Sequence, residues 1–497
     1  MSASQNKKAR QEERKGGFPD AKAQQQREEQ AKKRRNRIIG AVASVVVVLL
    51  IIGSFVVNSD YFYTRTAAIT IGDTEYTTAE YNYFYFSAYY SFQEQLGDAA
   101  SSVIDTDRPL DEQEYVDGQT FDDLFRESAI ESMTELTVLY DEAVAAGTVV
   151  SEERMADVDT QIAEIETYAS IYGMTTEQFL TQNYGKGFDL DTLRSLLEMG
   201  VMVEEFAQQK LDSYEYTDDE LKAEYDANKD SYDIFTYRVY YVGNGEDAEA
   251  AAATADAIAA AETGEEFADL VYENAPEDSR SSYEDPDSTL YVSSGSTLDS
   301  YDYGEWLKDP SRTEQETAVI ESSSGEGRFV VMFLGRDDND YATVDVRHIL
   351  IEVQADEDGE YTDEAREEAL TRIEEIRDEF EAGDRTEESF AALANEYSED
   401  PGSNTTGGLY ENIAHSQMVV PFEEFCFAKH EPGDIGIVYA ESSNYAGYHL
   451  IYFVGENMNY CDYIADTTMR TADYTEWLDG LKSACTVETH YSLRFAG

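Results

Sequence analysis

Two histidines in the second half of the chain have the setting of a chemical site. His348 lies in the apolar segment Val346–Ile351 and His449 in the apolar segment Gly447–Phe453, and both segments are typical of β-strands. A histidine ring donates and accepts hydrogen bonds and changes charge near neutral pH, so a pair of them is able to hold the polar side of a site. A lone strand histidine is more often structural than catalytic, so the interpretation depends on the residues between the two.

The segment between the histidines contains four features in a fixed order. An amphipathic helix comes first, then the loop Tyr397–Ser403, a Gly407-Gly408 pair and the run Gln417–Glu423. In this order and spacing, residues 346–454 resemble the parvulin (PpiC-type rotamase) domain, whose family activity is cis/trans isomerisation of X-Pro peptide bonds. The resemblance implies an α+β fold in which the two histidine strands are central neighbours.

The resemblance also implies roles for single residues. Rotation about an X-Pro bond crosses a barrier of about 20 kcal/mol and needs neither a nucleophile nor a metal. An enzyme lowers this barrier by preferring the twisted amide, which calls for an apolar seat for the proline ring and a polar cluster around the carbonyl. Met418 and Phe422 match the seat, His348 and His449 match the paired histidines, and Asp400 falls where the family carries Cys or Asp beside the carbonyl. We therefore expect His348, Asp400 and His449 to be catalytic.

The sequence departs from the family pattern at two places. The usual Gly-Gly-Asp-Leu-Gly turn is replaced by Gly407–Glu411, so that Tyr410 takes an apolar leucine position of the proline pocket. Ala446 stands where the family carries Ser or Thr near the second histidine. These changes leave the pocket recognisable and its catalytic rate open.

Other classes of site have no signal in the sequence. There is no Walker loop or dinucleotide glycine pattern, no Cys/His cluster has zinc spacing, and Asp337–Asp340 lacks the glycine and distal glutamate of an EF-hand. We expect no metal and no cofactor. Cys461 and Cys485 flank the last helical pattern, and they either pair in an oxidising exterior or remain free thiols.

Charge and hydropathy divide the chain near its start. Residues 1–37 hold 12 of the 36 basic residues, and the rest of the chain has a net charge of −75. Ile38–Val57 contains 20 uncharged residues, enough for a helix to cross a bilayer, and the basic residues before it favour a cytoplasmic N-terminus. We expect a signal anchor with everything after Asn58 outside the cell. Such an acidic exterior excludes nucleic acid as a partner.

Helical patterns follow the apolar segment. Capping boxes at Thr77 with Glu80 and at Thr217 with Glu220, together with helix ends at Gly147 and Gly173, predict a helical region over about 60–232. Its opening strand, turn and helix resemble the N-terminal chaperone domain of SurA- and PrsA-type foldases.

Residues 234–336 are similar to the parvulin segment in outline. Tyr237–Val242 and Arg328–Gly335 mirror the two histidine strands, but Val239 replaces His348 and Phe329 replaces His449. We interpret this segment as a degenerate copy that keeps the fold and lacks the chemistry. Beyond Gly455 a final short helix is expected around Trp477, and in related foldases the C-terminal segment packs on the N-terminal domain.

The sequence therefore predicts an α+β protein with six parts. They are a cytoplasmic tail (1–37), a membrane anchor (38–57), a helical chaperone domain (58–233), a degenerate parvulin-like domain (234–340), a parvulin domain (341–457) and a C-terminal helical segment (458–497). The expected function is peptidyl-prolyl isomerisation and folding of exported polypeptides at the outer side of the membrane. The alternative is a holdase that binds unfolded chains without catalysis, because aromatic residues are dense over Tyr81–Phe92. The sequence leaves open the client proteins, the oligomeric state and whether the anchor is cleaved.

Overall fold

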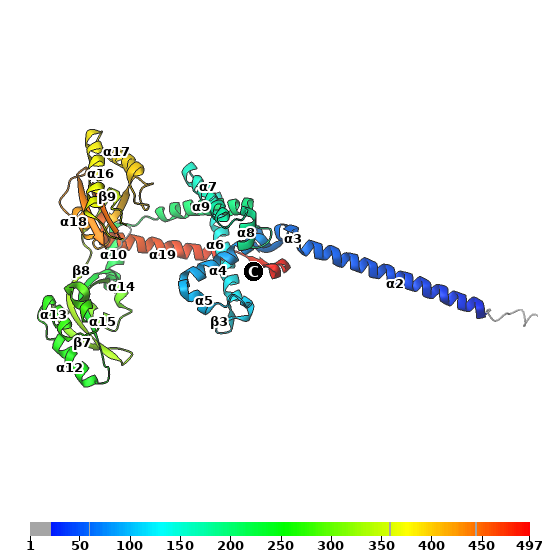
Figure 1. The fold of residues 1–497 in the computed structure, drawn as a ribbon, viewed down its shortest axis with the longest axis horizontal. Helices are drawn as coiled ribbons and strands as arrows, with labels where there is room; N and C mark the ends of the chain where they lie inside the picture. The colour runs from blue at the N-terminus through cyan, green and yellow to red at the C-terminus, as the bar shows by residue number, and fades with distance from the viewer. Residues whose placement is uncertain (1–20, 59, 357–358, 443–444) are drawn as a thin grey trace, which may run out of the picture. The chain divides into compact units, whose positions relative to one another are not determined.

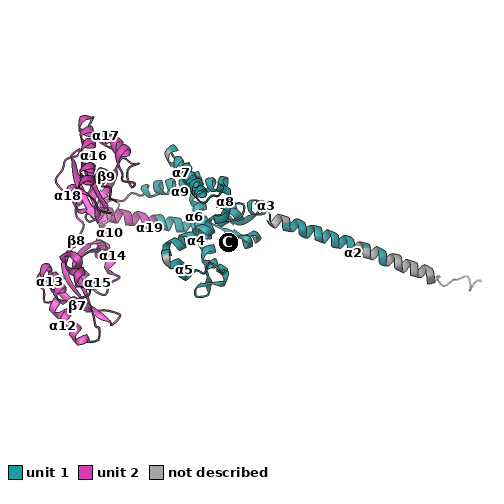
Figure 2. Cartoon of the chain, viewed as in Figure 1, with its two compact units in different colours: residues 1–213, 474–497 teal, residues 214–473 magenta. Residues whose placement is uncertain are grey.

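The expected α+β character is confirmed by the computed structural model, which describes residues 21–58, 60–356, 359–442 and 445–497. The chain divides into two compact units (Figure 2). Unit 1 is Met1–Ser213 with Tyr474–Gly497, and unit 2 is Tyr214–Asp473.

Helix α2 (Ala21–Asn58) contains the segment that we expected to cross a membrane. In the parts of the chain whose placement is described, no helix has a stretch long and apolar enough to span a bilayer. Four positions of the expected segment, residues 38 and 55–57, lie outside the residues whose side chains are described. The cytoplasmic tail falls largely outside the described residues as well, so the anchor stays a prediction.

Unit 1 is built mainly from helices around an aromatic core. Its longer helices are α4 (Thr78–Leu96), α6 (Phe121–Ala146), α7 (Glu152–Ile171), α8 (Thr176–Tyr184) and α9 (Leu190–Asp212). Both halves of the capping box between Thr77 and Glu80 are present, and Gly147 ends α6 in the left-handed conformation, as predicted. Tyr81, Tyr85 and Phe125 are buried between α4 and α6 and against the strand that precedes them.

The C-terminal segment completes a small sheet in unit 1. Strand β13 (Val487–Thr489) pairs with β1 (Ala67–Ile71), which pairs in turn with β2 (Thr74–Thr77). The C-terminal residues therefore pack on the N-terminal region, as the analogy with related foldases suggested.

The prediction of a short final helix was wrong. Helix α19 runs over 25 residues, Tyr460–Ala484, because no proline or glycine interrupts the segment before Gly480 and its first part has its own apolar contacts. Cys461 and Cys485 do not form a disulfide in the structure. The structure describes all three cysteines, and each is a free thiol.

Unit 2 contains two four-stranded antiparallel sheets with corresponding strand orders, β6-β5-β8-β7 and β10-β9-β12-β11. The first is formed by β5 (Ile234–Gly243), β6 (Leu290–Ser294), β7 (Thr317–Glu321) and β8 (Gly327–Asp337). The second is formed by β9 (Ala342–Glu352), β10 (Leu409–Ile413), β11 (Ile435–Ser442) and β12 (Tyr445–Asn459). Residues 234–337 thus form a sheet whose strand order corresponds to that of the second, with helices α12 (Ala248–Ile258) and α13 (Gly264–Asn274) on one side of it.

The second sheet has two different faces (Figure 1). One face packs on α16 (Asp363–Ala382) and α17 (Glu387–Tyr397) through a core that includes Ile349 and Leu450. The other face carries Val346 and Ile451 and packs on the short helix α18 (Val420–Cys426). Because side chains alternate along a strand, His348 and His449 lie on this second face.

Candidate active site

The register of the two central strands brings the predicted histidines together. His348 on β9 lies opposite Ile451, and His449 on β12 lies opposite Leu350, so the two histidines are diagonal neighbours on one face of the sheet. Their Nδ1 atoms are 3.2 Å apart, and their exposed fractions are 3% and 7%. Two buried rings at this distance share one hydrogen bond.

Asp400 extends this contact on the side of His348. It lies in the loop after α17, and its Oδ2 is 2.9 Å from His348 Nε2. The hydroxyls of Ser403 and Tyr410 also donate to Oδ2, and the amide of Gly402 donates to Oδ1. The hydrogen bond from His348 is the largest cause that holds the pKa of the Asp400 carboxyl well below its usual range. Asp400 is therefore an ionised carboxylate at neutral pH, surrounded by donors.

His449 has the opposite electrostatic setting. Its pKa is lowered from 6.5 to about 4, and burial is the largest cause. The neighbouring His348 also lowers this pKa, and Asp400 opposes both by a smaller amount. A neutral ring has one N–H donor and one acceptor nitrogen. His449 is consequently a neutral hydrogen-bonding group, rather than a charged one, at pH 7.

The predicted proline seat lies beside the histidines. Phe422 on α18 is 2% exposed, and its ring stands edge-on to both imidazoles, with centroids 5.4 Å from His348 and 5.3 Å from His449. Met418 precedes the helix and packs in the same apolar cluster. A cavity of about 610 Å³ adjoins Met418 and is lined by residues of the loop before α18 and of the helix itself. The hydrogen-bonded histidines and the apolar side chain of Phe422 are therefore in direct contact.

Tyr410 takes part in both surfaces. Its ring lies 5.1 Å from the His348 ring and belongs to the apolar cluster of Phe422, while its hydroxyl donates to Asp400 over 3.2 Å. The sequence predicted only the apolar part of this position. Strand β10 holds the residue there because Tyr410 pairs with Val346, two residues before His348.

The glycine pair before β10 is required by close contact with β9. Gly408 has a φ of +71°, and a Cβ on it would lie 2.1 Å from the carbonyl oxygen of His348. In return the amide of His348 donates to the carbonyl of Gly408 over 2.8 Å. Gly408 therefore fixes the backbone position of His348.

Sequence reasoning missed two residues of this site. Ser403 is 1% exposed and lies between Asp400 and His348, although its loop was one of the features that pointed to the site. Tyr445 places its hydroxyl 2.6 Å from His449 Nε2. The family pattern directed attention to Ala446, which is buried on the helix-covered face and contacts neither histidine by hydrogen bond.

The first sheet of unit 2 has no such site at the corresponding positions. Val239 lies opposite Val331 and Phe329 lies opposite Tyr241, the same register offsets that His348 and His449 have in the second sheet. The Phe329 ring contacts Tyr241 and Tyr303, with centroids 5.0 and 5.2 Å away. The histidine positions are therefore filled by apolar packing.

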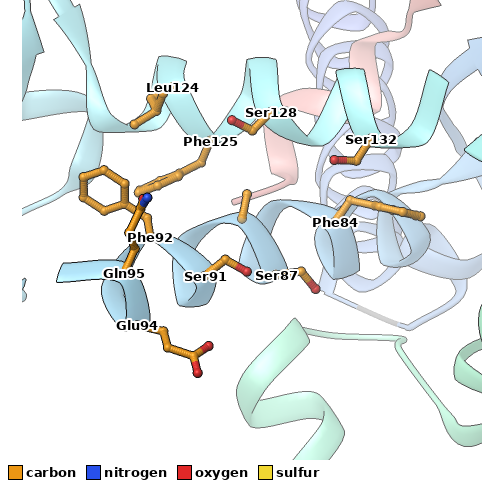
Figure 3. A pocket seen from close by; sticks show the side chains of 11 residues that line it. Phe84, Ser87, Ser91, Phe92, Glu94, Gln95, Leu124, Phe125, Ser128 and Ser132 are labelled. Carbon is orange, nitrogen blue, oxygen red and sulfur yellow. The ribbon is translucent and has the colours of Figure 1, made fainter. Parts of the chain in front are cut away.

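A separate cavity lies between α4 and α6 in unit 1. Its volume is about 710 Å³, and a second cavity of about 560 Å³ shares three of its lining residues, Phe84, Ser128 and Ser132. Figure 3 shows aromatic and serine side chains of the two helices along it. Within the aromatic segment Tyr81–Phe92, Tyr81 and Tyr85 are core residues, whereas Phe84 and Phe92 line the cavity.

Comparison with known proteins gives a family for one part of the chain. Residues 330–456 match the family model of the PPIC-type PPIASE domain. This range contains the two histidines, Asp400 and the residues of the proline seat. No curated protein matches the chain by sequence.

Several solved structures resemble the chain weakly. The PrsA structure from Bacillus subtilis is 15% identical, covers 73% of this chain and 88% of its own, and gives a TM-score of 0.30. The foldase PrsA from Streptococcus pneumoniae is 15% identical, with 50% and 74% covered and a TM-score of 0.23. A SurA-like chaperone structure from Campylobacter jejuni is 13% identical, with 84% and 94% covered and a TM-score of 0.18.

Proposed function

We propose that this chain is an extracytoplasmic foldase that catalyses cis/trans isomerisation of X-Pro bonds in exported polypeptides. The observation that carries the proposal is the hydrogen-bonded series His449, His348 and Asp400 next to the apolar seat of Phe422. This arrangement lies entirely within the residues that match the PPIC-type domain.

The chemistry follows from the charge distribution of the amide. In a planar X-Pro bond, resonance places negative charge on the carbonyl oxygen, and twisting the bond removes part of that charge. An ionised Asp400 near the carbonyl disfavours the planar form more than the twisted one, so the barrier falls. The apolar seat holds the proline ring while the rest of the bond rotates.

A peptide assay on the full chain tests this proposal. The chain should accelerate isomerisation of a short X-Pro peptide in a protease-coupled assay. Replacement of Met418 by Ala should raise KM and lower kcat/KM by roughly tenfold, because it removes apolar contact with the proline ring.

The matched control is the neighbouring residue Val419, which is 44% exposed. Val419→Ala should leave kcat/KM within about twofold of the wild-type value, since an exposed side chain contributes little. A chain that folds by circular dichroism and does not accelerate the reaction contradicts the proposal.

The location outside the membrane is part of the proposal. It is supported by the uncharged run Ile38–Val57 behind a basic segment and by the net charge of −75 in the remainder. Protease added to intact cells should remove residues after the run and leave the N-terminal segment. Protection of the whole chain contradicts this orientation.

A holdase is the second candidate, and the cavity between α4 and α6 favours it. Its apolar walls and serine hydroxyls suit an extended polypeptide with mixed side chains. A Ser132→Trp variant that fills the cavity should then abolish suppression of client aggregation, whereas Val144→Trp on an exposed part of α6 should not. If Asp400→Ala with Met418→Ala abolishes rescue of clients in cells and Ser132→Trp does not, isomerisation is the function that matters.

A further inference from the structure

Tyr445 and His449 lie on the same face of β12, four residues apart, with Gly447 between them. The Tyr445 hydroxyl reaches His449 Nε2 over 2.6 Å by passing across position 447. A Cβ at Gly447 would lie 2.8 Å from that hydroxyl oxygen and 2.7 Å from a methyl carbon of Leu350. The missing side chain at Gly447 is therefore what allows the tyrosine to reach the histidine.

Asp400, at one end of the hydrogen-bonded series, determines which nitrogen of His348 carries a proton. An ionised carboxylate only accepts, so His348 Nε2 must carry a proton to donate to Asp400. A His348 ring that carries its single proton on Nε2 accepts at Nδ1, so His449 Nδ1 must donate to it. His449 Nε2 is left as an acceptor, and the Tyr445 hydroxyl lies where it can donate to it.

We propose that Tyr445 is a positioning residue that fixes the tautomers of both histidines through one aligned series of donors, from Tyr445 through His449 and His348 to Asp400. The effect of Tyr445 on catalysis rests on the proposed isomerase function, whereas its effect on the histidine tautomers does not. The Tyr445 hydroxyl lies next to His449, where the family pattern would place the hydroxyl of a Ser or Thr at position 446. Burial raises the pKa of the Tyr445 phenol, which keeps its proton available for donation.

The site gains a fixed orientation from this series. Without the phenol, His449 Nε2 loses this donor, and the ring is free to carry its proton on Nε2 instead. His348 then loses the donor to its Nδ1, and its hydrogen bond to Asp400 is no longer determined by the rest of the site. Tyr445 acts on Asp400 through the two rings and does not itself lie against the proline seat.

Nitrogen NMR of the full chain with ¹⁵N-labelled histidine tests the proposal, because the chain has five histidines and thus few signals. At pH 7 the wild-type His449 should be protonated on Nδ1 and His348 on Nε2. Tyr445→Phe should move the His449 proton toward Nε2 and lower kcat/KM by roughly threefold to tenfold with KM unchanged. Gly447→Ala should do the same, by obstructing the tyrosine.

The control is Tyr448→Phe, whose ring lies on the other face of the sheet and packs against Tyr439. It should change neither the histidine signals nor kcat/KM. The proposal is overturned if the wild-type His449 is protonated on Nε2, if either histidine carries both protons at pH 7, or if Tyr445→Phe leaves the signals unchanged. Because the histidine signals do not depend on turnover, a chain without isomerase activity still gives a decisive answer.

Discussion

His449 couples the protonation of the site to the stability of its sheet. The histidine has a pKa of about 6.5 in the unfolded chain and about 4 in the folded one. Between these values the unfolded chain binds the proton and the folded chain does not, so stability rises with pH across this window. The contribution is fully present above about pH 6.5, is lost as the pH falls toward 4, and amounts to at most about 3 kcal/mol.

Native-state hydrogen exchange of the β9 and β12 amides measures this effect within one unit of the chain. The difference in opening free energy between wild type and His449→Gln should be larger at pH 7 than at pH 4.5. Comparison with the variant cancels the titration of the many carboxylates elsewhere. A difference that does not change with pH would show that His449 is not kept neutral by burial.

At the scale of elements, the positions of the histidines were predictable, and two of their hydrogen-bond partners, Ser403 and Tyr445, were not. Apolar alternation around His348 and His449 identified two strands, and the capping box at Thr77 identified a helix start, because each is a local pattern. Tyr445 escaped prediction because its role depends on the absence of a side chain at Gly447, a matter of three-dimensional reach. Helix α8 lies inside the helical region that was predicted, and Thr175 and Gln178 form a capping box at its start.

The length of α19 illustrates a further limit. Its first turns are stabilised by contacts with Leu221 and Tyr225, which are far away in sequence, so the local pattern near Trp477 defined only its second half. Likewise, the family pattern predicted only an apolar role for Tyr410, in the position of a leucine. Only the fold shows that its hydroxyl reaches Asp400.

The contact between Gly408 and β9 gives a prediction at this scale. Gly408→Ala should lower the free energy of unfolding of the second sheet by about 2–4 kcal/mol, because its Cβ meets the His348 carbonyl and forces the strands apart. Gly433→Ala is the matched control, since Gly433 also has a positive φ but its Cβ would lie 3.7 Å from the Tyr452 hydroxyl. The control should cost about 1 kcal/mol, the price of the left-handed conformation alone. Equal losses for the two variants, measured by hydrogen exchange, would contradict the account.

At the scale of the whole molecule, the two sheets of unit 2 share a strand order and differ in chemistry. Val239 and Phe329 cannot hydrogen bond through their side chains, so the first sheet has no hydrogen-bonding side chain at the two positions that correspond to the histidines. We expect residues 234–337 to contribute no isomerase activity to the chain. Two roles remain open to this region, a spacer and a surface for extended clients.

The central claim is that catalysis resides in the second sheet of unit 2. NMR of an X-Pro peptide tests it most directly, since enzyme-catalysed exchange broadens the separate cis and trans signals without a coupling protease. The wild-type full chain should broaden these signals, and a chain with Asp400→Ala and Met418→Ala should not, although its first sheet is intact. Sharp signals with the folded wild-type chain, or equal broadening with the double variant, would contradict the claim.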